Sequence, residues 1–253
     1  VRTSTTSSSI PGSVSHPRST ELTAILPTYN EEGSVAVVVS GLLTRGVGEV
    51  LVADNGSTDR SADVAREAGA RVVSAPVRGY GSACSGGLAS LRENCRFVLF
   101  CDADGADDLA RLRDVVTPVL DGEADLVIGS RVLGESEPGA LSVQQRFGNW
   151  LAARLLRIFH RAEVTDLGPF RCVSREALDR IQMVDRGFGW TVEMQAKAYG
   201  LGLRTKEVPV DAKRRIAGKS KIGGNLRASV IAGKVILSTI WKHRKFGARS
   251  SGQ

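Results

Sequence analysis

The stretch Phe97-Val-Leu-Phe-Cys-Asp102-Ala-Asp104-Gly decides the fold, because an unbroken apolar run ends abruptly in two carboxylates. Such a run is typical of a strand buried on both faces, as strands are in parallel sheets. Asp102 and Asp104 are two positions apart, so extended backbone places both side chains on one face. Two hard oxygen ligands on one face predict a site for Mg²⁺ or Mn²⁺ that phosphate oxygens and water complete.

Similar apolar runs precede and follow this stretch. From residue 21 onward they alternate with amphipathic segments, which is typical of strand-helix-strand units around a parallel sheet. We predict strands at residues 22–27, 49–53, 71–74, 97–101 and 125–128. We predict helices at residues 32–43, 61–68, 81–92, 109–120 and 147–159. The pattern therefore indicates a single α/β domain with a mostly parallel central sheet flanked by helices.

Polar residues follow three of the predicted strands at the point where each strand ends. Open parallel sheets bind ligands in the crevice at the carboxyl ends of their strands, so we expect these residues to converge. They lie in Pro27-Thr-Tyr-Asn-Glu31, Asp54-Asn-Gly-Ser-Thr-Asp59 and Asp102-Ala-Asp104. Taken alone, an Asp-x-Asp pair is more often a polar loop or a helix cap than a metal site, and we expect capping from Asp59 or Thr58. The convergence of three strand ends favours a ligand site that includes Asp54.

The order and spacing of these motifs resemble family 2 glycosyltransferases of the GT-A fold. The matching segments are ILPTYNEE (residues 25–32), VADNGSTD (52–59), Asp102-Ala-Asp104 and Gly129-Ser-Arg131. In addition, RIAGKSKIGGN (215–225) resembles the substrate-binding segment of dolichyl-phosphate, or polyprenyl-phosphate, mannose synthases. The resemblance spans residues 22–225 and implies a single Rossmann-like GT-A domain that transfers a sugar from a nucleotide diphosphate with inversion.

The resemblance also implies roles for individual residues. It assigns the donor's base and ribose to the first two strand ends, the metal to the aspartate pair, and phosphate binding to basic residues. The donor-binding residues are thus Pro27, Tyr29, Glu31, Asp54, Asp102, Ala103, Asp104, Arg131, Arg215 and Lys221. Asp104, Arg131 and Arg215 are implied in catalysis, since fixed cations and a metal stabilise a departing diphosphate. Ala106 stands where related synthases often carry Gln, so Asp107 or water would replace that metal ligand.

The acceptor decides whether a general base is needed. A lipid phosphate is already ionised near neutral pH, whereas a sugar hydroxyl must lose a proton to a carboxylate. Asp166 and Glu193 are the candidates for that role, and each is equally typical of a turn or helix residue. We expect a hexose, mannose from GDP-mannose first and glucose from UDP-glucose second, to reach a polyprenyl phosphate. A hydroxyl of a glycolipid or small molecule is the alternative acceptor.

Charge and amphipathic pattern suggest contact with an anionic membrane. The chain carries a net charge of +7, which favours polyanionic partners. Residues 147–159 and 226–241 place apolar residues at helical spacing among basic ones, and a basic cluster follows at 242–245. Both segments are also compatible with core-facing helices that have a basic outer face. No apolar run reaches the ~20 residues that span a bilayer.

These features give an expected layout and location. We expect a disordered tail at residues 1–20, which lack the apolar stretch of a signal peptide, the GT-A domain at 21–225, and a C-terminal amphipathic helix with a basic tail at 226–253. The four cysteines show no metal-ligand spacing and are predicted to be reduced core thiols. The protein is thus expected in the cytoplasm, at the cytoplasmic face of the membrane.

Two other classes of protein are disfavoured. A dinucleotide-binding oxidoreductase needs a third glycine where Cys84 stands after Gly79-Tyr-Gly81, and that motif does not follow the first strand. A noncatalytic nucleic-acid binder would explain the positive charge but not the strands that end in carboxylates. We therefore expect no nucleic-acid partner.

Overall fold

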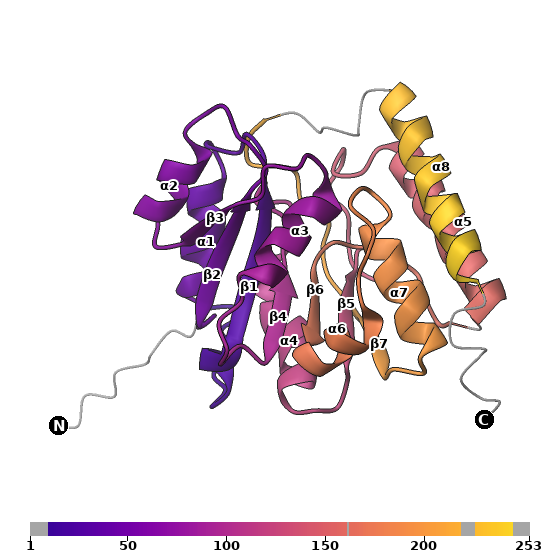
Figure 1. The fold of residues 1–253 in the computed structure, drawn as a ribbon, viewed down its shortest axis with the longest axis horizontal. Coiled ribbons are helices and arrows are strands. Elements are labelled where there is room, and N and C mark those ends of the chain that lie inside the picture. The colour runs from indigo at the N-terminus through magenta and orange to yellow at the C-terminus, as the bar shows by residue number, and fades with distance from the viewer. Residues whose placement is uncertain (1–9, 161, 219–225, 245–253) are drawn as a thin grey trace.

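A seven-stranded sheet forms the centre of the protein, in the order β3-β2-β1-β4-β6-β5-β7 (Figure 1). The computed structural model describes residues 10–160, 162–218 and 226–244. β6 runs antiparallel to its neighbours β4 and β5, and the other pairings are parallel. The expected single domain with a mostly parallel sheet is confirmed.

The elements follow one another as strands and helices in alternation. The strands are β1 (Leu22–Thr28), β2 (Glu49–Asp54), β3 (Arg71–Ser74), β4 (Phe97–Phe100), β5 (Leu126–Ser130), β6 (Arg171–Ser174) and β7 (Thr205–Pro209). The helices are α1 (Val35–Leu43), α2 (Ser61–Glu67), α3 (Tyr80–Ala89), α4 (Leu112–Leu120), α5 (Val143–His160), α6 (Arg175–Ile181), α7 (Trp190–Gly200) and α8 (Leu226–His243). Short 3₁₀ turns, η1 (Ser19–Glu21) and η2 (Leu109–Arg111), precede β1 and α4.

Helices cover both faces of the sheet because successive strand residues point to opposite sides. In β1, Ala24 and Leu26 join a core with α1, α2 and α4, whereas Ile25 joins a second core with α3, α6 and α7. A third core lies between α5, α7 and α8, where Leu156, Val192 and Ile240 are buried. The helices α5 and α8 lie side by side at one end of the molecule (Figure 1).

All five predicted strands and all six predicted helices, including the C-terminal one, are present in the described residues, but two further strands and two further helices were not predicted. These are β6, α6, α7 and β7. β6 has only four residues and begins with Arg171, a residue type that rarely starts a buried strand. Arg171 is nevertheless fully buried, since its guanidinium donates to the carbonyl oxygens of Leu167, Gly168 and Thr191. β7 is short and mostly polar, so its sequence lacks the apolar run used to find the other strands.

The expectation of a disordered tail through residue 20 is wrong for residues 10–20. Val14 is buried in the core beside α1, and its amide donates to the carbonyl of Arg45 at 2.7 Å. Arg18 stacks on Phe97, with its guanidinium carbon 4.4 Å from the ring centroid. Residues 1–9 and the predicted basic tail at 245–253 lie outside the described residues.

The C-terminal helix and the cysteines agree with the sequence. The helix predicted at residues 226–241 is α8, and it packs against α5 and α7 as part of the same body. Cys84, Cys95, Cys101 and Cys172 are buried free thiols. Within the described part of the chain, no helix is long and apolar enough to cross a membrane.

Candidate active site

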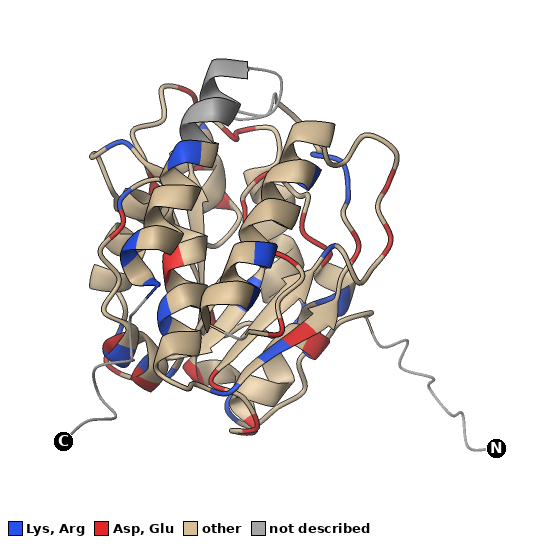
Figure 2. Cartoon of the chain, turned by 90° about the vertical axis from the view of Figure 1, so that its right-hand side faces the viewer, with Lys and Arg blue, Asp and Glu red and all other residues tan. Residues whose placement is uncertain are grey.

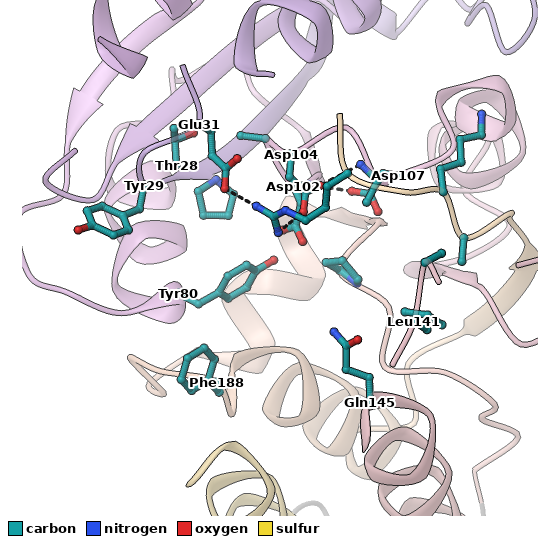
Figure 3. Close-up of a pocket in the computed structure, with 18 of the residues that line it drawn as sticks. Thr28, Tyr29, Glu31, Tyr80, Asp102, Asp104, Asp107, Leu141, Gln145 and Phe188 are labelled. Carbon is teal, nitrogen blue, oxygen red and sulfur yellow. Dashed lines mark hydrogen bonds and ion pairs between the residues drawn. The ribbon is translucent and has the colours of Figure 1, made fainter. Parts of the chain in front are cut away.

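A cavity of about 750 Å³ lies at the carboxyl ends of β1, β2 and β4, where the sequence predicted a ligand site. The register aligns these ends, because Thr28 of β1 pairs with Asp54 of β2 and Ile25 pairs with Phe100 of β4. Figure 3 shows the side chains that face the cavity. Eight of the predicted donor-binding residues line it: Pro27, Tyr29, Glu31, Asp102, Ala103, Asp104, Arg131 and Arg215.

Three carboxylates meet at the floor of this cavity. Asp104 accepts a hydrogen bond from the amide of Ala106 at 2.9 Å, and Asp107 accepts one from the amide of Asp102 at 2.8 Å. Burial, together with the charges of Asp104 and Asp107, raises the pKa of Asp102 well above its usual value. Burial also raises the pKa of Asp107 to about 7. A bound cation would stabilise the ionised form of carboxylates that lie this close together.

The carboxylate oxygens at this place suit a divalent cation that takes only some of its ligands from the protein. Among the described residues, no group of three or more His, Cys, Asp or Glu side chains is arranged to enclose a metal. Mg²⁺ and its analogues are commonly held by one or two carboxylates, with substrate phosphates and water filling the other positions. Asp102 and Asp104 match that arrangement, since both line a cavity with room for a diphosphate.

Arg215 joins two of the strand ends across the cavity. Its guanidinium lies 2.5 Å from a carboxylate oxygen of Glu31 and 2.6 Å from one of Asp104 (Figure 3). The backbone beside it is fixed as well, because the amide of Ile216 donates to the carbonyl of Asp104 at 2.9 Å. Gly105 has φ of +76°, and an added Cβ there would overlap Ile216, so the two segments approach too closely for a side chain. The segment after β7 therefore places the positively charged guanidinium of Arg215 beside the aspartate pair.

A second group of residues forms the wall beyond β1 and β2. Arg78 stacks on Tyr29, with its guanidinium carbon 3.3 Å from the ring centroid. Arg78 also donates to the carbonyl of Asn55 at 2.9 Å, and the Asn55 side chain accepts from the amide of Gly79 at 2.9 Å. A flat aromatic ring with a guanidinium over it and hydrogen-bonding groups around it is suited to a nucleobase.

The end of β2 contributes less than expected. Asp54 does not line the cavity, and its carboxylate instead accepts from the amide of Ser57 at 3.3 Å. Its neighbour Asn55 takes the place facing the cavity. Asp59 accepts from the amide of Ser61, the first residue of α2, at 3.0 Å, but the residue at the N-cap position is Arg60 and not the predicted Asp59 or Thr58.

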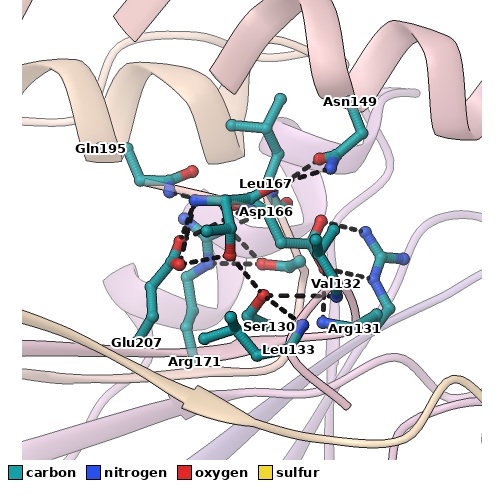
Figure 4. A network of polar contacts seen from close by, with 12 residues as sticks. Ser130, Arg131, Val132, Leu133, Asn149, Asp166, Leu167, Arg171, Gln195 and Glu207 are labelled. Atoms are coloured by element: carbon teal, nitrogen blue, oxygen red, sulfur yellow. Dashed lines mark hydrogen bonds and ion pairs between the residues drawn. The ribbon is translucent and has the colours of Figure 1, made fainter. Parts of the chain in front are cut away.

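Arg131 and Asp166 form a buried ion pair at the end of β5. Both carboxylate oxygens of Asp166 accept from the Arg131 guanidinium at 2.8 Å, and the Arg131 amide donates to one of them (Figure 4). Burial opposes ionisation of Asp166, but the ion pair prevails and lowers its pKa below the usual value. Glu207 of β7 accepts from the amides of Thr165 and Asp166, which fixes the loop. Asp166 thus holds Arg131 and does not line the main cavity.

A second cavity of about 520 Å³ adjoins the first and shares Arg131, Leu141 and Gln145 with it. Its wall is formed by α5, which begins with Ser142 and Gln145 capping each other's backbone amides at 2.9 and 3.2 Å. Three arginines line this cavity together with Asp166 and several uncharged polar side chains, and Trp150 also lines it. The arginines are Arg131, Arg146 and Arg157.

Two of the predicted site residues lie elsewhere. Glu193 is fully buried in α7, where it forms an ion pair with Lys197 at 2.6 Å and accepts from the amide of Asp185 at 2.7 Å. It lines neither cavity, and its contacts hold the loop before α7. Lys221 lies outside the described residues, so its phosphate-binding role stays a prediction from the sequence.

Several cavity residues were not predicted from the sequence. They are Thr28, Asn55, Arg78, Tyr80, Gln145 and Phe188. The signal for two of them was present, because Arg78-Gly79-Tyr80 starts the helix that follows β3, where parallel sheets place ligand-binding turns. Phe188 belongs to the loop between α6 and α7, which does not follow a strand, so the sequence pattern gave no signal for it.

Comparison with known proteins identifies the family. Residues 23–182 match the model of glycosyl transferase family 2, so the chain belongs to that family. An uncharacterized glycosyltransferase of Mycobacterium tuberculosis is 40% identical over 213 residues, which cover 83% of this chain and 94% of the relative. The low-salt glycan biosynthesis hexosyltransferase Agl6 of Haloferax volcanii is 33% identical over 75% of this chain and 47% of its own length.

Solved structures agree with this assignment. Glucosyl-3-phosphoglycerate synthase of Mycobacterium tuberculosis, in complex with Mn²⁺, UDP and glucosyl-3-phosphoglycerate, superposes with a TM-score of 0.70 at 25% identity. The match covers 88% of this chain and 79% of the synthase. The GT-A fold expected from the sequence is therefore confirmed.

Proposed function

We propose that this glycosyltransferase moves a hexose from a nucleoside diphosphate to a polyprenyl phosphate at an anionic membrane surface, with a divalent cation at Asp102 and Asp104. The observation that carries the proposal is the cavity in which these carboxylates lie between the Tyr29–Arg78 wall and the arginines Arg131 and Arg215. The wall would bind a nucleobase, the carboxylates would bind a diphosphate through the metal, and the arginines would bind a second phosphate.

The reaction needs one bond to form as another breaks. An acceptor oxygen attacks C1 of the hexose from the face opposite the donor's diphosphate, and the bond from C1 to the β-phosphate oxygen breaks, which inverts the configuration. The nucleoside diphosphate leaves with the bonding electrons. Bound Mg²⁺ or Mn²⁺ would neutralise the charge that develops on it. Arg215, beside Asp104, is placed to add a second positive charge.

The carboxylates of the site favour an acceptor that is already ionised. Asp166 is a weak base, because both its oxygens bind Arg131 and its pKa is lowered. Glu193 lies outside both cavities. Asp166 lines the second cavity but is a poor general base, and Glu193 does not reach a cavity, so neither carboxylate suits the deprotonation of a sugar hydroxyl. A phosphate acceptor needs no such base, and the arginines of the second cavity suit its charge.

The outer face of α5 supports an acceptor held in a membrane. Val143, Phe147, Trp150, Arg154 and Ile158 recur at intervals of three or four residues, and all five are exposed. On neighbouring α8, Trp241 and Lys242 are also exposed, and neither helix sequence contains Asp or Glu. Figure 2 shows this end of the molecule with basic residues on both helices. Aromatic and basic side chains on one face favour an anionic bilayer.

The proposal also concerns which nucleotide sugar is the donor. The sequence favoured GDP-mannose first and UDP-glucose second. The synthase that binds Mn²⁺ and UDP, together with the hexosyltransferase relative, supports a hexose donor and raises UDP-glucose beside GDP-mannose. The Tyr29–Arg78 wall could stack either base.

The proposal is tested by assaying nucleotide sugars with Mg²⁺ or Mn²⁺ against a short-chain polyprenyl phosphate, phosphoglycerate and a glycolipid hydroxyl acceptor. Products are identified by mass spectrometry. We expect metal-dependent formation of a polyprenyl phosphohexose. A product with phosphoglycerate or the hydroxyl acceptor alone would overturn the acceptor assignment, and no metal-dependent turnover of any donor would overturn the proposal as a whole.

The membrane surface has its own test, co-sedimentation with phosphatidylglycerol and with phosphatidylcholine vesicles. The double variant Phe147→Ser/Ile158→Ser removes two exposed apolar residues of α5 that line neither cavity. Val37→Ser is the matched control, since Val37 is equally exposed on α1 at 57%. We expect the double variant alone to lose about tenfold or more of its binding to phosphatidylglycerol vesicles. Equal binding by all three proteins would refute the surface.

A further inference from the structure

The hydroxyl of Tyr80 is an unexplained polar group in the wall of the main cavity. Tyr80 is the first residue of α3, and its hydroxyl oxygen is buried without a hydrogen-bond partner among the described residues. Figure 3 shows the hydroxyl directed toward Asp102, with Phe188 and Gln145 facing the same space from other segments. The residue lines the cavity but has no role in the fold that requires its oxygen.

A buried hydroxyl without a partner is costly, so it indicates a ligand that provides one. The thiol of Cys84, one turn further along α3, interacts with this hydroxyl, but a thiol is only a weak hydrogen-bonding group. Burial, followed by the charge of Asp102, raises the pKa of Tyr80 well above its usual value. The hydroxyl therefore stays protonated at neutral pH and can both donate and accept a hydrogen bond.

The backbone that carries Tyr80 is fixed by the loop before α7. The amide of Ser82 donates to the carbonyl of Arg186 at 2.9 Å, and the amide of Gly81 donates to that of Gly187 at 3.2 Å. Gly79 has φ of +139°, and a Cβ there would collide with the Arg186 carbonyl, so the loop packs directly on the start of α3. These contacts hold the start of α3, and with it Tyr80, at the wall of the cavity.

We propose that the Tyr80 hydroxyl hydrogen-bonds a hydroxyl group of the donor hexose and so helps to select the sugar. The inference rests on the proposed function, because it takes the diphosphate to lie at Asp102 and Asp104. The base then lies against Tyr29 and Arg78, and the hexose extends past Asp102 into the space that Tyr80, Phe188 and Gln145 enclose.

The test compares Tyr80→Phe with the wild type and with Tyr199→Phe. Tyr199 is a matched control, since its hydroxyl donates to the carbonyl of Glu163 at 3.3 Å and lines neither cavity. With UDP-glucose or GDP-mannose, whichever the wild type uses, we expect kcat/KM of Tyr80→Phe to fall about tenfold, the value of one hydrogen bond. The affinity for UDP or GDP with Mn²⁺, measured by calorimetry, should stay unchanged, because neither contains a hexose.

Donors that lack one hydroxyl identify the partner. The assay is repeated with the 2-, 3-, 4- and 6-deoxy forms of the active donor. With one of them, kcat/KM of the wild type should fall by the same factor of about ten relative to the complete donor, whereas kcat/KM of Tyr80→Phe should hardly change. Activity of Tyr80→Phe within twofold of the wild type would refute the role. An equal loss of nucleoside diphosphate affinity would also refute it, because Tyr80 would then act on the nucleotide. A wild type that turns over no nucleotide sugar would instead refute the proposed function.

Discussion

Asp102 at the end of β4 and Asp166 beside β5 both lie in the protein's polar clefts, yet their pKa values are shifted in opposite directions. Asp102 has a raised pKa, because burial and two neighbouring carboxylates disfavour its charge. Asp166 has a lowered pKa, because the Arg131 ion pair outweighs burial. The first group has too little positive charge around it, whereas the second is matched by its own partner.

This difference indicates a ligand-binding role for the region around Asp102 and a structural role for the loop at Asp166. The loop at Asp166 is held by Glu207, Asn149 and Gln195, so its polar groups are satisfied within the protein. At Asp102 the guanidiniums of Arg131 and Arg215 favour the charged form, but they do not outweigh burial and the neighbouring carboxylates. Groups left undercompensated in a cavity are typical of functional sites. Substitutions at the two places should therefore affect different properties.

Asp104→Ala should have the largest effect, and on turnover alone. Loss of a metal ligand removes charge stabilisation worth several kcal/mol, so we expect transfer to fall by on the order of 100-fold or more. The fold should persist, because Arg215 keeps its ion pair with Glu31. Transfer assays and thermal melting measure the two effects, with Asp114→Ala on the surface of α4 as control. Activity equal to that of the control would contradict the metal role.

Asp166→Asn should chiefly reduce stability. The substitution leaves the buried Arg131 guanidinium without its countercharge, and breaking a buried pair in this way costs about 3 kcal/mol or more. Urea unfolding of the metal-free protein measures the loss. Mn²⁺ affinity should change little, since Asp166 does not line the main cavity. A variant as stable as the wild type would show that the ion pair is not what holds this loop.

The pH dependence of the metal-free protein should show the smallest effect. The pKa of Asp107 is raised from 3.8 to about 7, so the stability it contributes is present below pH 3.8 and is lost as pH rises through about 7. We expect unfolding free energy in EDTA to decline from pH 5 to 8, and less steeply in Asp107→Asn. Mn²⁺ affinity should rise over that range, by up to about tenfold per pH unit for each proton released. Parallel pH profiles in the two proteins would contradict this.

The sequence predicted the first half of the sheet well because each of those strands is an apolar run followed by polar residues. Asp102 and Asp104 could be placed on the same side of the site from their spacing alone. Glu31 could be placed at the site as part of the first strand end, whereas Arg215, 184 residues further along the chain, could be placed there only through the family resemblance. Asn55 lines the cavity where the sequence favoured its neighbour Asp54, because a strand end offers two adjacent polar residues and sequence does not tell which one faces the cavity.

The second half was harder to predict because β6 runs in the opposite direction. In a parallel strand the residues that follow the strand reach the site, whereas in β6 the residues that precede it do so. Pro169 and Gly168 therefore lie beside the ends of β4 and β5, and Arg171 is buried by carbonyl groups of its own loop. Neither the alternation of strands nor the apolar pattern contains that information.

The bridge made by Arg215 has a consequence for how the site fills. Its guanidinium already serves as an internal counterion between Glu31 and Asp104, so a metal that coordinates the same oxygen of Asp104 must compete with it. A diphosphate that arrived with a metal would offer the guanidinium a new set of oxygens. Such an exchange of partners would favour the metal–nucleotide complex over the bare ion.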